Sequence, residues 1–427
     1  SASAPGPSSP SAPVASAAPA PAPDAGAGAP SACRVASAPE SVDDKKGTAS
    51  EYGTMHLENL RVLVDGDTTA ITWERQADFT VGDSWREPVL VLRRGDGPFR
   101  VANLPVMAYA CATSGHAGVL SASEPFVSWG ARNLEGFEVW RDVPSVGPEP
   151  STTIRSSAAR TIPTRQHLGR LATSKSVALA TAREPACPAA VSTPPSSGSA
   201  PVPADVCHCF TWKDGLWLFP LKAGAKPTLV APMKDMDMLD AAPALAMGDQ
   251  GGIGAYRSNG AIHVVFVDAA GGLAAPPVQI DRGEVGAPAV AVADGKAVVV
   301  WAKRAGKSAP YVLQWTTTDL TKREIPKTRT WATSGSAFAP SVVTDGATAA
   351  VTWMEGNDTS QGRVLFARAP LDREAPLEGL KVSIDAESNA RDPEISGPVG
   401  APTVVYAAFN KQRPGGVARV ARVVCGS

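Results

Sequence analysis

The sequence predicts an all-β protein, and three observations favour that class. Asp-Gly pairs recur between short apolar segments, as at Asp294-Gly295 and Asp345-Gly346, and such pairs supply the positive φ angles that a tight hairpin turn needs. The segments beside them include unbroken apolar runs such as 298–300, which are typical of strands buried on both faces. An aromatic residue follows these turns at a similar distance, so the turns and runs belong to a repeat.

The aromatic residue serves as an anchor by which the repeat can be followed along the chain. Residues 287–301 (APAVAVADGKAVVVW) and 339–353 (APSVVTDGATAAVTW) are the two clearest copies. Weaker copies bring the anchors to seven, one about every 50 residues: Trp73, Trp129, Ala180, Tyr256, Trp301, Trp353 and Tyr406. A period near 50 residues with two hairpins in each unit is typical of β-propeller blades. We therefore expect residues 33–427 to form a seven-bladed β-propeller.

The third unit is interrupted by a Pro/Ser/Ala-rich insertion at 185–205. Its strands are expected at 169–174 and 177–182, and beyond the insertion at 206–212 and 216–221, with a turn at Asp214-Gly215. A long loop of this kind inside a compact domain is usually functional or disordered.

The seventh unit lacks one strand. Only the segments around 393–395, 403–409 and 417–424 have strand character, so we expect residues 33–42 to supply the fourth strand and close the ring. That arrangement places Cys33 beside Cys425 and predicts a disulfide between them, which on the chain-entropy model would contribute more than about 4 kcal/mol.

The first 32 residues and the overall composition limit the classes of partner. Residues 1–32 contain only Ser, Ala, Pro, Gly, Val and one Asp, so we expect a disordered Pro/Ala-rich tether. Lys plus Arg number 40 against 41 Asp plus Glu, which argues against a nucleic-acid partner. No apolar stretch approaches the roughly 18 residues of a membrane-spanning helix, although a lipid anchor upstream of the tether stays open.

Arginines close to the ends of the second strands are the candidate ligand-binding residues: Arg75, Arg132, Arg183, Arg257 and Arg304. Because they stand at similar points of successive repeat units, they could converge on one mouth of the central channel. Arg suits the bidentate capture of an anion such as an acidic glycan. Alternatively they are solvated strand ends that pair with neighbouring acids. The sixth unit has Glu355 at this point.

The remaining cysteines are Cys111, Cys187, Cys207 and Cys209. We expect Cys187 to pair with Cys207 or Cys209 at the base of the insertion, and Cys111 to pair with the one left over. A four-sulfur zinc site is the alternative, although its spacing is not the usual C-x-x-C. An even number of cysteines in a tethered chain favours an oxidising location, either extracellular or in the periplasm or cell envelope.

Three further motifs are assigned no site. The acidic run at 235–240 could attract calcium but lacks the EF-hand pattern, so it is expected as a solvated turn. Arg94-Gly95-Asp96 falls where a hairpin turn is expected. The five histidines are scattered and no catalytic motif is present, so we predict no catalytic residue, metal or cofactor.

Residues 50–425 resemble bacterial secreted and cell-envelope β-propeller repeat proteins in general, through the Pro, Asp-Gly and Trp pattern. The resemblance implies no particular family. Sialidases share the propeller and use an arginine cluster, but their Ser-x-Asp-x-Gly-x-x-Trp box is absent from every unit. The main hypothesis is a non-catalytic module that presents a loop face to a protein or glycan partner. The alternative is a sialidase-like or polysaccharide-lyase-like enzyme with an arginine-lined channel mouth.

Overall fold

The computed structural model describes the following residues: 33–42, 55–78, 84–102, 116–121, 124–131, 134–139, 160–163, 167–174, 177–183, 214–220, 226–233, 243–356, 362–384, 389–410 and 413–426. All regular elements in these ranges are strands, which confirms the all-β prediction. Within the same ranges no helix is long and apolar enough to span a membrane. The predicted tether 1–32, the insertion 185–205 and the acidic run 235–240 lie outside the described residues.

The described strands form seven antiparallel sheets. The first sheet contains β3 (Met55–Asp65), β4 (Thr68–Asp78), β5 (Ser84–Arg94) and β6 (Arg100–Ala102). The second contains β7 (His116–Ser121), β8 (Glu124–Ala131), β9 (Leu134–Val139) and β10 (Arg160–Pro163). The third contains β11 (His167–Ser174), β12 (Val177–Arg183), β13 (Asp214–Pro220) and β14 (Thr228–Met233).

The other four sheets continue in chain order. The fourth sheet contains β15 (Ala244–Gly248), β16 (Gly251–Ser258), β17 (Ala261–Val267) and β18 (Val278–Arg282). The fifth contains β19 (Glu284–Ala293), β20 (Lys296–Arg304), β21 (Val312–Asp319) and β22 (Arg329–Trp331). The sixth contains β23 (Ala337–Thr344), β24 (Thr348–Glu355), β25 (Arg363–Pro370) and β26 (Leu380–Lys381). The seventh joins β27 (Asn389–Ser396), β28 (Thr403–Asn410) and β29 (Arg413–Cys425) to β1 (Cys33–Val35) and β2 (Glu40–Val42).

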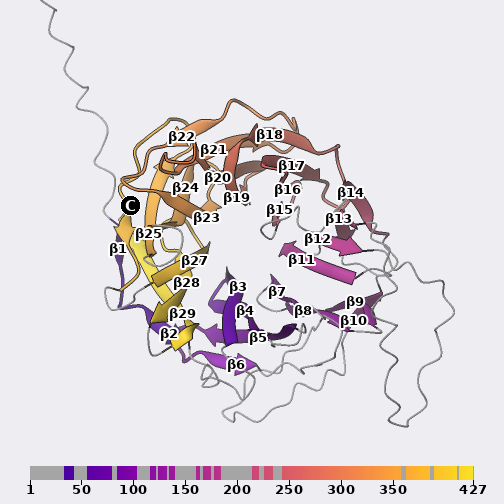
Figure 1. Cartoon of the computed structure of the whole chain (residues 1–427), viewed down its shortest axis with the longest axis horizontal. Helices are drawn as coiled ribbons and strands as arrows, with labels where there is room; N and C mark the ends of the chain where they lie inside the picture. The colour runs from indigo at the N-terminus through magenta and orange to yellow at the C-terminus, as the bar shows by residue number, and fades with distance from the viewer. Residues whose placement is uncertain are drawn as a thin grey trace, which may run out of the picture.

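The sheets follow one another round a ring, with the first strand of each nearest the centre (Figure 1). Each first strand contacts the first strand of the next sheet, and β27 contacts β3, so the ring is continuous. Hydroxyl groups bridge several of these contacts. The Val64 N–H donates to Ser396 Oγ at 2.8 Å and the Met247 N–H donates to Ser174 Oγ at 2.9 Å. The backbone of one sheet is thereby fixed against a side chain of the sheet before it.

The seven anchors, six aromatic residues and Ala180, all fall in the second strands, one in each sheet. Trp301, Trp353 and Tyr406 are fully buried. The apolar clusters around them combine residues from two neighbouring sheets, as in the core shared by the fifth and sixth sheets. The anchors therefore mark the packing between sheets, which explains their regular spacing in the sequence.

The Asp-Gly hairpins are formed as predicted at Asp294-Gly295 and Asp345-Gly346, and a third is formed at Asp65-Gly66 before the Trp73 anchor. Gly66, Gly295 and Gly346 connect the first and second strands of their sheets with φ angles of 57°, 72° and 87°. The expected turn at Asp214-Gly215 is wrong. Both residues lie in β13, where they pair with Arg183 and Ala182. A Cβ on Gly215 would stand 2.6 Å from Cδ1 of the exposed Leu229, so a larger residue there would require that side chain to move.

The third sheet is shifted relative to the prediction as a consequence. Its third strand is β13 at 214–220, and its fourth is β14 at 228–233. The expected strand at 206–212 lies outside the described residues. The residue types of Asp214-Gly215 are typical of a turn, but the pairing with β12 holds Gly215 in a strand conformation, outside the left-handed region.

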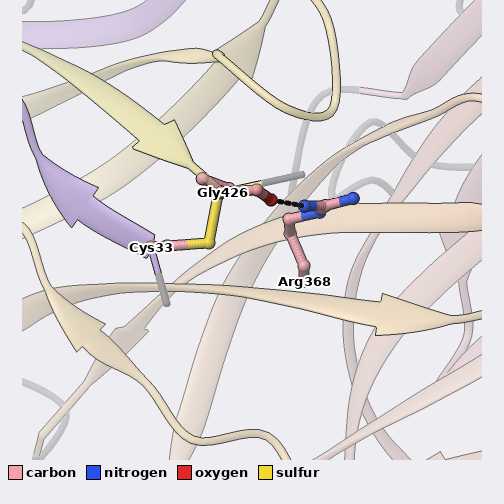
Figure 2. The surroundings of a disulfide bond; sticks show 4 residues. Cys33, Arg368 and Gly426 are labelled. Carbon is pink, nitrogen blue, oxygen red and sulfur yellow. Dashed lines mark hydrogen bonds between the residues drawn. A yellow bond between two sulfur atoms is a disulfide. The ribbon is translucent and has the colours of Figure 1, made fainter. Parts of the chain in front are cut away.

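The seventh sheet contains both ends of the described chain. Cys33 is opposite Cys425 in the β1–β29 ladder, and Val42 is opposite Ala418 in the β2–β29 ladder. The predicted Cys33–Cys425 disulfide is confirmed. Figure 2 shows it beside the Gly426 carbonyl, which accepts a hydrogen bond from Arg368 Nη1 of the sixth sheet at 3.3 Å. The other four cysteines lie outside the described residues.

Candidate functional site on the inner strands

The predicted arginine series lies mostly on second strands, one strand away from the ring centre. Arg75, Arg183 and Arg257 lie in β4, β12 and β16, while Arg132 lies outside the described residues. Arg304 ends β20, where Nη2 donates to Glu284 Oε2 at 3.1 Å and Nη1 donates to the Lys307 carbonyl at 3.0 Å. The described contacts of Arg304 keep its guanidinium within the fifth sheet, and convergence of the series on one mouth stays a prediction.

Glu355 forms a closed polar cluster at the equivalent point of the sixth sheet. Its side chain is buried and accepts hydrogen bonds from Arg363 Nε at 3.1 Å and Ser334 Oγ at 3.2 Å. A Cβ on Gly335 would stand 2.6 Å from the Glu355 carboxyl carbon. The carboxylate is thus fully enclosed by its own sheet and the loop before it, which identifies it as part of the framework.

A repeated β-bulge sets the shape of the inner strands. In β3, β11, β19, β23 and β27 three residue steps stand opposite two on the second strand. In three of these bulges a residue other than glycine has a positive φ: Asn59 (52°), Ala339 (43°) and Asp392 (52°). Bulges re-aim side chains and are enriched beside functional sites, and positive φ at a non-glycine residue is uncommon. The backbone of the inner strands therefore departs repeatedly from regular strand geometry.

Polar side chains of three inner strands meet beside these bulges. Arg61 of β3 donates from Nη1 to Glu394 Oε1 of β27 in an ion pair. Ser341 of β23 donates to Glu394 Oε2 at 2.9 Å, and its Oγ accepts from the Ile395 N–H at 3.2 Å. Glu394 is 23% exposed and Arg61 38% exposed. The pair therefore connects the sixth, seventh and first sheets while still reaching solvent.

Asp392 extends this group of charges. Its carboxylate lies 3.8 Å from Arg391 Nε and is 58% exposed, although it belongs to the innermost strand of its sheet. Partial desolvation by the neighbouring protein raises the pKa of Asp392 above its usual value, while Arg391 and Arg61 act to lower it. Arg391 in turn lies over the Phe409 ring at 4.1 Å, which fixes it beside Asp392.

We refer to Arg61, Ser341, Asp392 and Glu394 together as the inner-wall cluster. Arg61 is its guanidinium donor and Glu394 its carboxylate acceptor, and Asp392, two residues before Glu394 on β27, interacts electrostatically with Arg61. Sequence reasoning missed these residues because they sit on inner strands, whereas the arginine series was sought at strand ends. The signal that could have indicated these bulged strands is the residue pairs Asp392-Pro393 and Ala339-Pro340, but such pairs were used only to follow the repeat.

No protein-family model matches the chain, and no curated protein matches its sequence. Its structure is similar to an α-L-arabinofuranosidase of Fusarium graminearum (TM-score 0.45, 11% identity, 91% of this chain and 97% of that chain). It is also similar to an acylaminoacyl peptidase of Pyrococcus horikoshii (TM-score 0.47, 7% identity, 88% and 52%). A third similar structure is a mutant Trypanosoma rangeli sialidase displaying trans-sialidase activity (TM-score 0.39, 6% identity, 91% and 57%).

Proposed function

We propose that the chain is a seven-bladed β-propeller that binds a glycan at the inner-wall cluster and carries out no chemistry on it. The observation that carries the proposal is the ion pair between Arg61 and Glu394 on bulged inner strands, with Asp392 two residues from Glu394. All three side chains are partly exposed to solvent. The seven sheets and their continuous ring support the blade count. Blade packing holds the cluster rigid, so little conformational entropy is lost on binding.

The chemistry of the cluster suits hydroxyl groups. A hydroxyl both donates and accepts hydrogen bonds, whereas a carboxylate only accepts and a guanidinium only donates. Neighbouring hydroxyls of a sugar can therefore bind Asp392 and Arg61 together. An acidic glycan, the ligand expected from the arginine series, would need cations beyond the balanced charges of this cluster.

The protein is proposed to act outside the cytoplasm, in the extracellular space or the cell envelope, with residues 1–32 as a spacer. The Cys33–Cys425 disulfide supports an oxidising compartment, because such bonds are rare where thiols are kept reduced. A protein partner in an envelope assembly remains part of this proposal, as the ligand that carries the glycan or as a neighbour that binds the loop face.

The test is glycan-array screening of the full chain followed by calorimetric titration of each hit. Asp392→Asn removes a charge from the cluster and should weaken binding by about 10-fold, the loss of one charge-assisted hydrogen bond. Asp372→Asn removes the same charge from an exposed loop and is the matched control. Equal affinity of the two variants would place the ligand elsewhere, and the absence of any glycan hit would leave the protein partner as the ligand to be sought.

A glycan-active enzyme is the second candidate, favoured by one specific observation. Asp392 and Glu394 are two residues apart on β27, Arg61 acts on both, and partial desolvation raises the pKa of Asp392. Most glycosidases use two carboxyl groups, one of which is held protonated by a raised pKa. In this reading Asp392 donates the proton and Glu394 stabilises the positive charge that develops on the sugar.

Turnover distinguishes the two candidates. Each glycan found to bind is incubated with the wild-type protein and with the Asp392→Asn and Glu394→Gln variants, and the products are separated by chromatography. Cleavage by the wild type that both substitutions abolish would replace the binding proposal by the enzyme. Recovery of intact glycan from the wild type at saturation supports the binding module.

A further inference from the structure

An aromatic pair lies where the fifth and sixth sheets meet, at the start of the inner strand β23. The rings of Tyr311 and Phe338 have centroids 4.7 Å apart and are inclined by 54° to each other. Tyr311 directly precedes β21, and Phe338 is the second residue of β23. Both residues are only half-buried. The pair therefore presents aromatic surface to solvent beside an inner strand of the ring.

Tyr311 is held firmly in place. Its N–H donates to Ser336 Oγ at 3.0 Å, and its carbonyl accepts from the Ala337 N–H at 3.0 Å. The Arg304 guanidinium lies over its ring, 4.8 Å from the centroid. The side chain also packs against the core shared by the fifth and sixth sheets. Tyr311 is thus fixed from several sides and supports the neighbouring ring of Phe338.

Phe338 is less enclosed than Tyr311. Within the described part of the chain, it is not among the residues that form or pack against the cores of the fifth, sixth and seventh sheets. Its partner across the β23–β24 ladder is Met354, a flexible side chain that packs well beside aromatic rings. A half-exposed phenylalanine outside these cores contributes little to folding by burial. Its exposed surface is therefore available to a ligand.

The bulge in β23 places Phe338 on the same face of the sheet as the inner-wall cluster. Phe338 is opposite Met354 and Ser341 is opposite Thr352. Met354 and Thr352 are two residues apart on β24, so they lie on one face, and residues opposite each other in a ladder share a face. Ser341 on that face donates to Glu394 of the seventh sheet. Phe338 and the inner-wall cluster therefore lie along the same side of β23.

The two positions are within reach of one short oligosaccharide. Three strand residues span about 10 Å at about 3.3 Å each, which is longer than a single sugar ring but within the length of linked sugars. The chemistry of the two positions is also complementary. A sugar ring carries C–H groups on one face, and the electron-rich face of an aromatic ring attracts such hydrogens. The polar cluster binds the hydroxyl groups instead.

We propose that Phe338, supported by Tyr311, is a second subsite that stacks on the C–H face of a sugar linked to the one at the inner-wall cluster. This subsite rests on the glycan-binding function proposed above and narrows its ligand to an oligosaccharide of at least two sugars. The stacked sugar is a neutral one, because Phe338 offers no charge to pair with an acidic group.

Calorimetric titration with sugars of increasing length tests the subsite. The probes are the monosaccharide, disaccharide and trisaccharide of each neutral glycan that binds the full chain on the array. The disaccharide should bind about 10-fold more tightly than the monosaccharide, as expected for one added aromatic contact. Equal affinities of all three would overturn the subsite but leave the inner-wall cluster as a binding site. No binding by any probe would overturn both.

Two substitutions at one position assign the gain to the aromatic ring. Phe338→Leu keeps an apolar side chain but removes the aromatic face, so the disaccharide should lose most of its advantage. Phe338→Tyr keeps the face and should keep the advantage. An equal response of the two variants would overturn the assignment to Phe338. The comparison of sugar lengths on the wild type decides the proposal even if Phe338→Leu fails to fold.

Asp392→Asn separates the second subsite from the inner-wall cluster. This variant should weaken the monosaccharide and the disaccharide by the same factor, because both use the cluster. Phe338→Leu should weaken the disaccharide alone. Loss of monosaccharide binding in Phe338→Leu would contradict the proposal, since Phe338 would then be needed for the shape of the cluster and not for a second sugar.

Discussion

The contact between the fourth and fifth sheets and the contact between the fifth and sixth sheets use different side chains at equivalent positions. We call them the first joint and the second joint. Asp281 and Trp331 occupy equivalent places, on the fourth strand opposite Ile262 and Leu313, the second residues of their third strands. At the first joint, Trp301 Nε1 donates to Asp281 Oδ2 at 2.8 Å, and Asp281 also pairs with Lys303. At the second joint, Trp331 replaces the aspartate.

The core of the second joint consists of apolar side chains. Trp331 stacks on Trp315 with ring centroids 4.9 Å apart, and both share a core with Trp353. Among the residues that the structure describes, the buried indole nitrogens of all three have no hydrogen-bond partner. The repeat therefore preserves the place and size of the anchor but not its hydrogen bond. Buried apolar area stabilises the second joint, whereas at the first joint the charged acceptor Asp281 orients Trp301.

Breaking the Cys33–Cys425 disulfide of the seventh sheet should give the largest loss of stability. The losses at the first and second joints can be compared with it. Cys425→Ser removes the cross-link between residues 392 apart in sequence, and on the chain-entropy model this should cost roughly 4 kcal/mol or more. Urea unfolding of the variant measures it as a lower midpoint. Cys33→Ser removes the same cross-link and should match this variant, and an unchanged midpoint in both would show that strand pairing alone closes the ring.

Truncating the equivalent residues compares the two non-covalent joints. Trp331→Ala leaves a cavity in a dry core and should cost ~3–5 kcal/mol. Asp281→Ala removes a hydrogen-bond acceptor and should cost ~1–3 kcal/mol, mainly through the unpaired Trp301 N–H. Both are read from urea midpoints at constant slope. A larger loss for Asp281→Ala would reverse the distinction between the joints.

Replacing the anchors themselves isolates the hydrogen bond. Trp301→Phe and Trp353→Phe remove the same volume, but only the first removes a bonded N–H. We expect Trp301→Phe to be the more destabilising of the two by ~1–2 kcal/mol. Differential scanning calorimetry of the two variants side by side measures the difference, and equal losses would mean that the Asp281 contact contributes nothing net.

The smallest expected effect concerns the joint at the inner-wall cluster. The pKa of Asp392 is raised in the folded protein, so its contribution to stability is present below the unfolded pKa and is lost as pH rises through the folded pKa. Asp392→Asn should therefore gain stability relative to the wild type as pH rises from about 3 to 7. Tm values of both proteins across this range measure the effect. A constant difference would mean that Asp392 titrates as it does in the unfolded chain.

The parts of the structure that the sequence predicts are those governed by local rules. Asp294-Gly295 requires a hairpin, and Trp301 and Trp353 recur because each fills the space between two sheets. The Cys33–Cys425 pair follows from counting strands in the seventh unit. Asp214-Gly215 misled the prediction because the conformation of its glycine depends on the pairing with β12.

The inner-wall cluster was beyond such rules. Arg61, Ser341 and Glu394 are distant in sequence and become neighbours only when three sheets meet at the ring centre. Arg93 likewise appears as an ordinary strand residue until Glu40 of β2 pairs with it. Both arrangements depend on contacts between sheets, which a repeat pattern describes only by its average spacing.

The closed seventh sheet also imposes an order in time. β1 and β2 precede the other described strands, yet their partner β29 is the last strand that the structure describes. Their edges stay unpaired until β29 has been made, and pairing at such long range makes folding slow. A chain that stops before β29 would therefore leave its first strands without a partner.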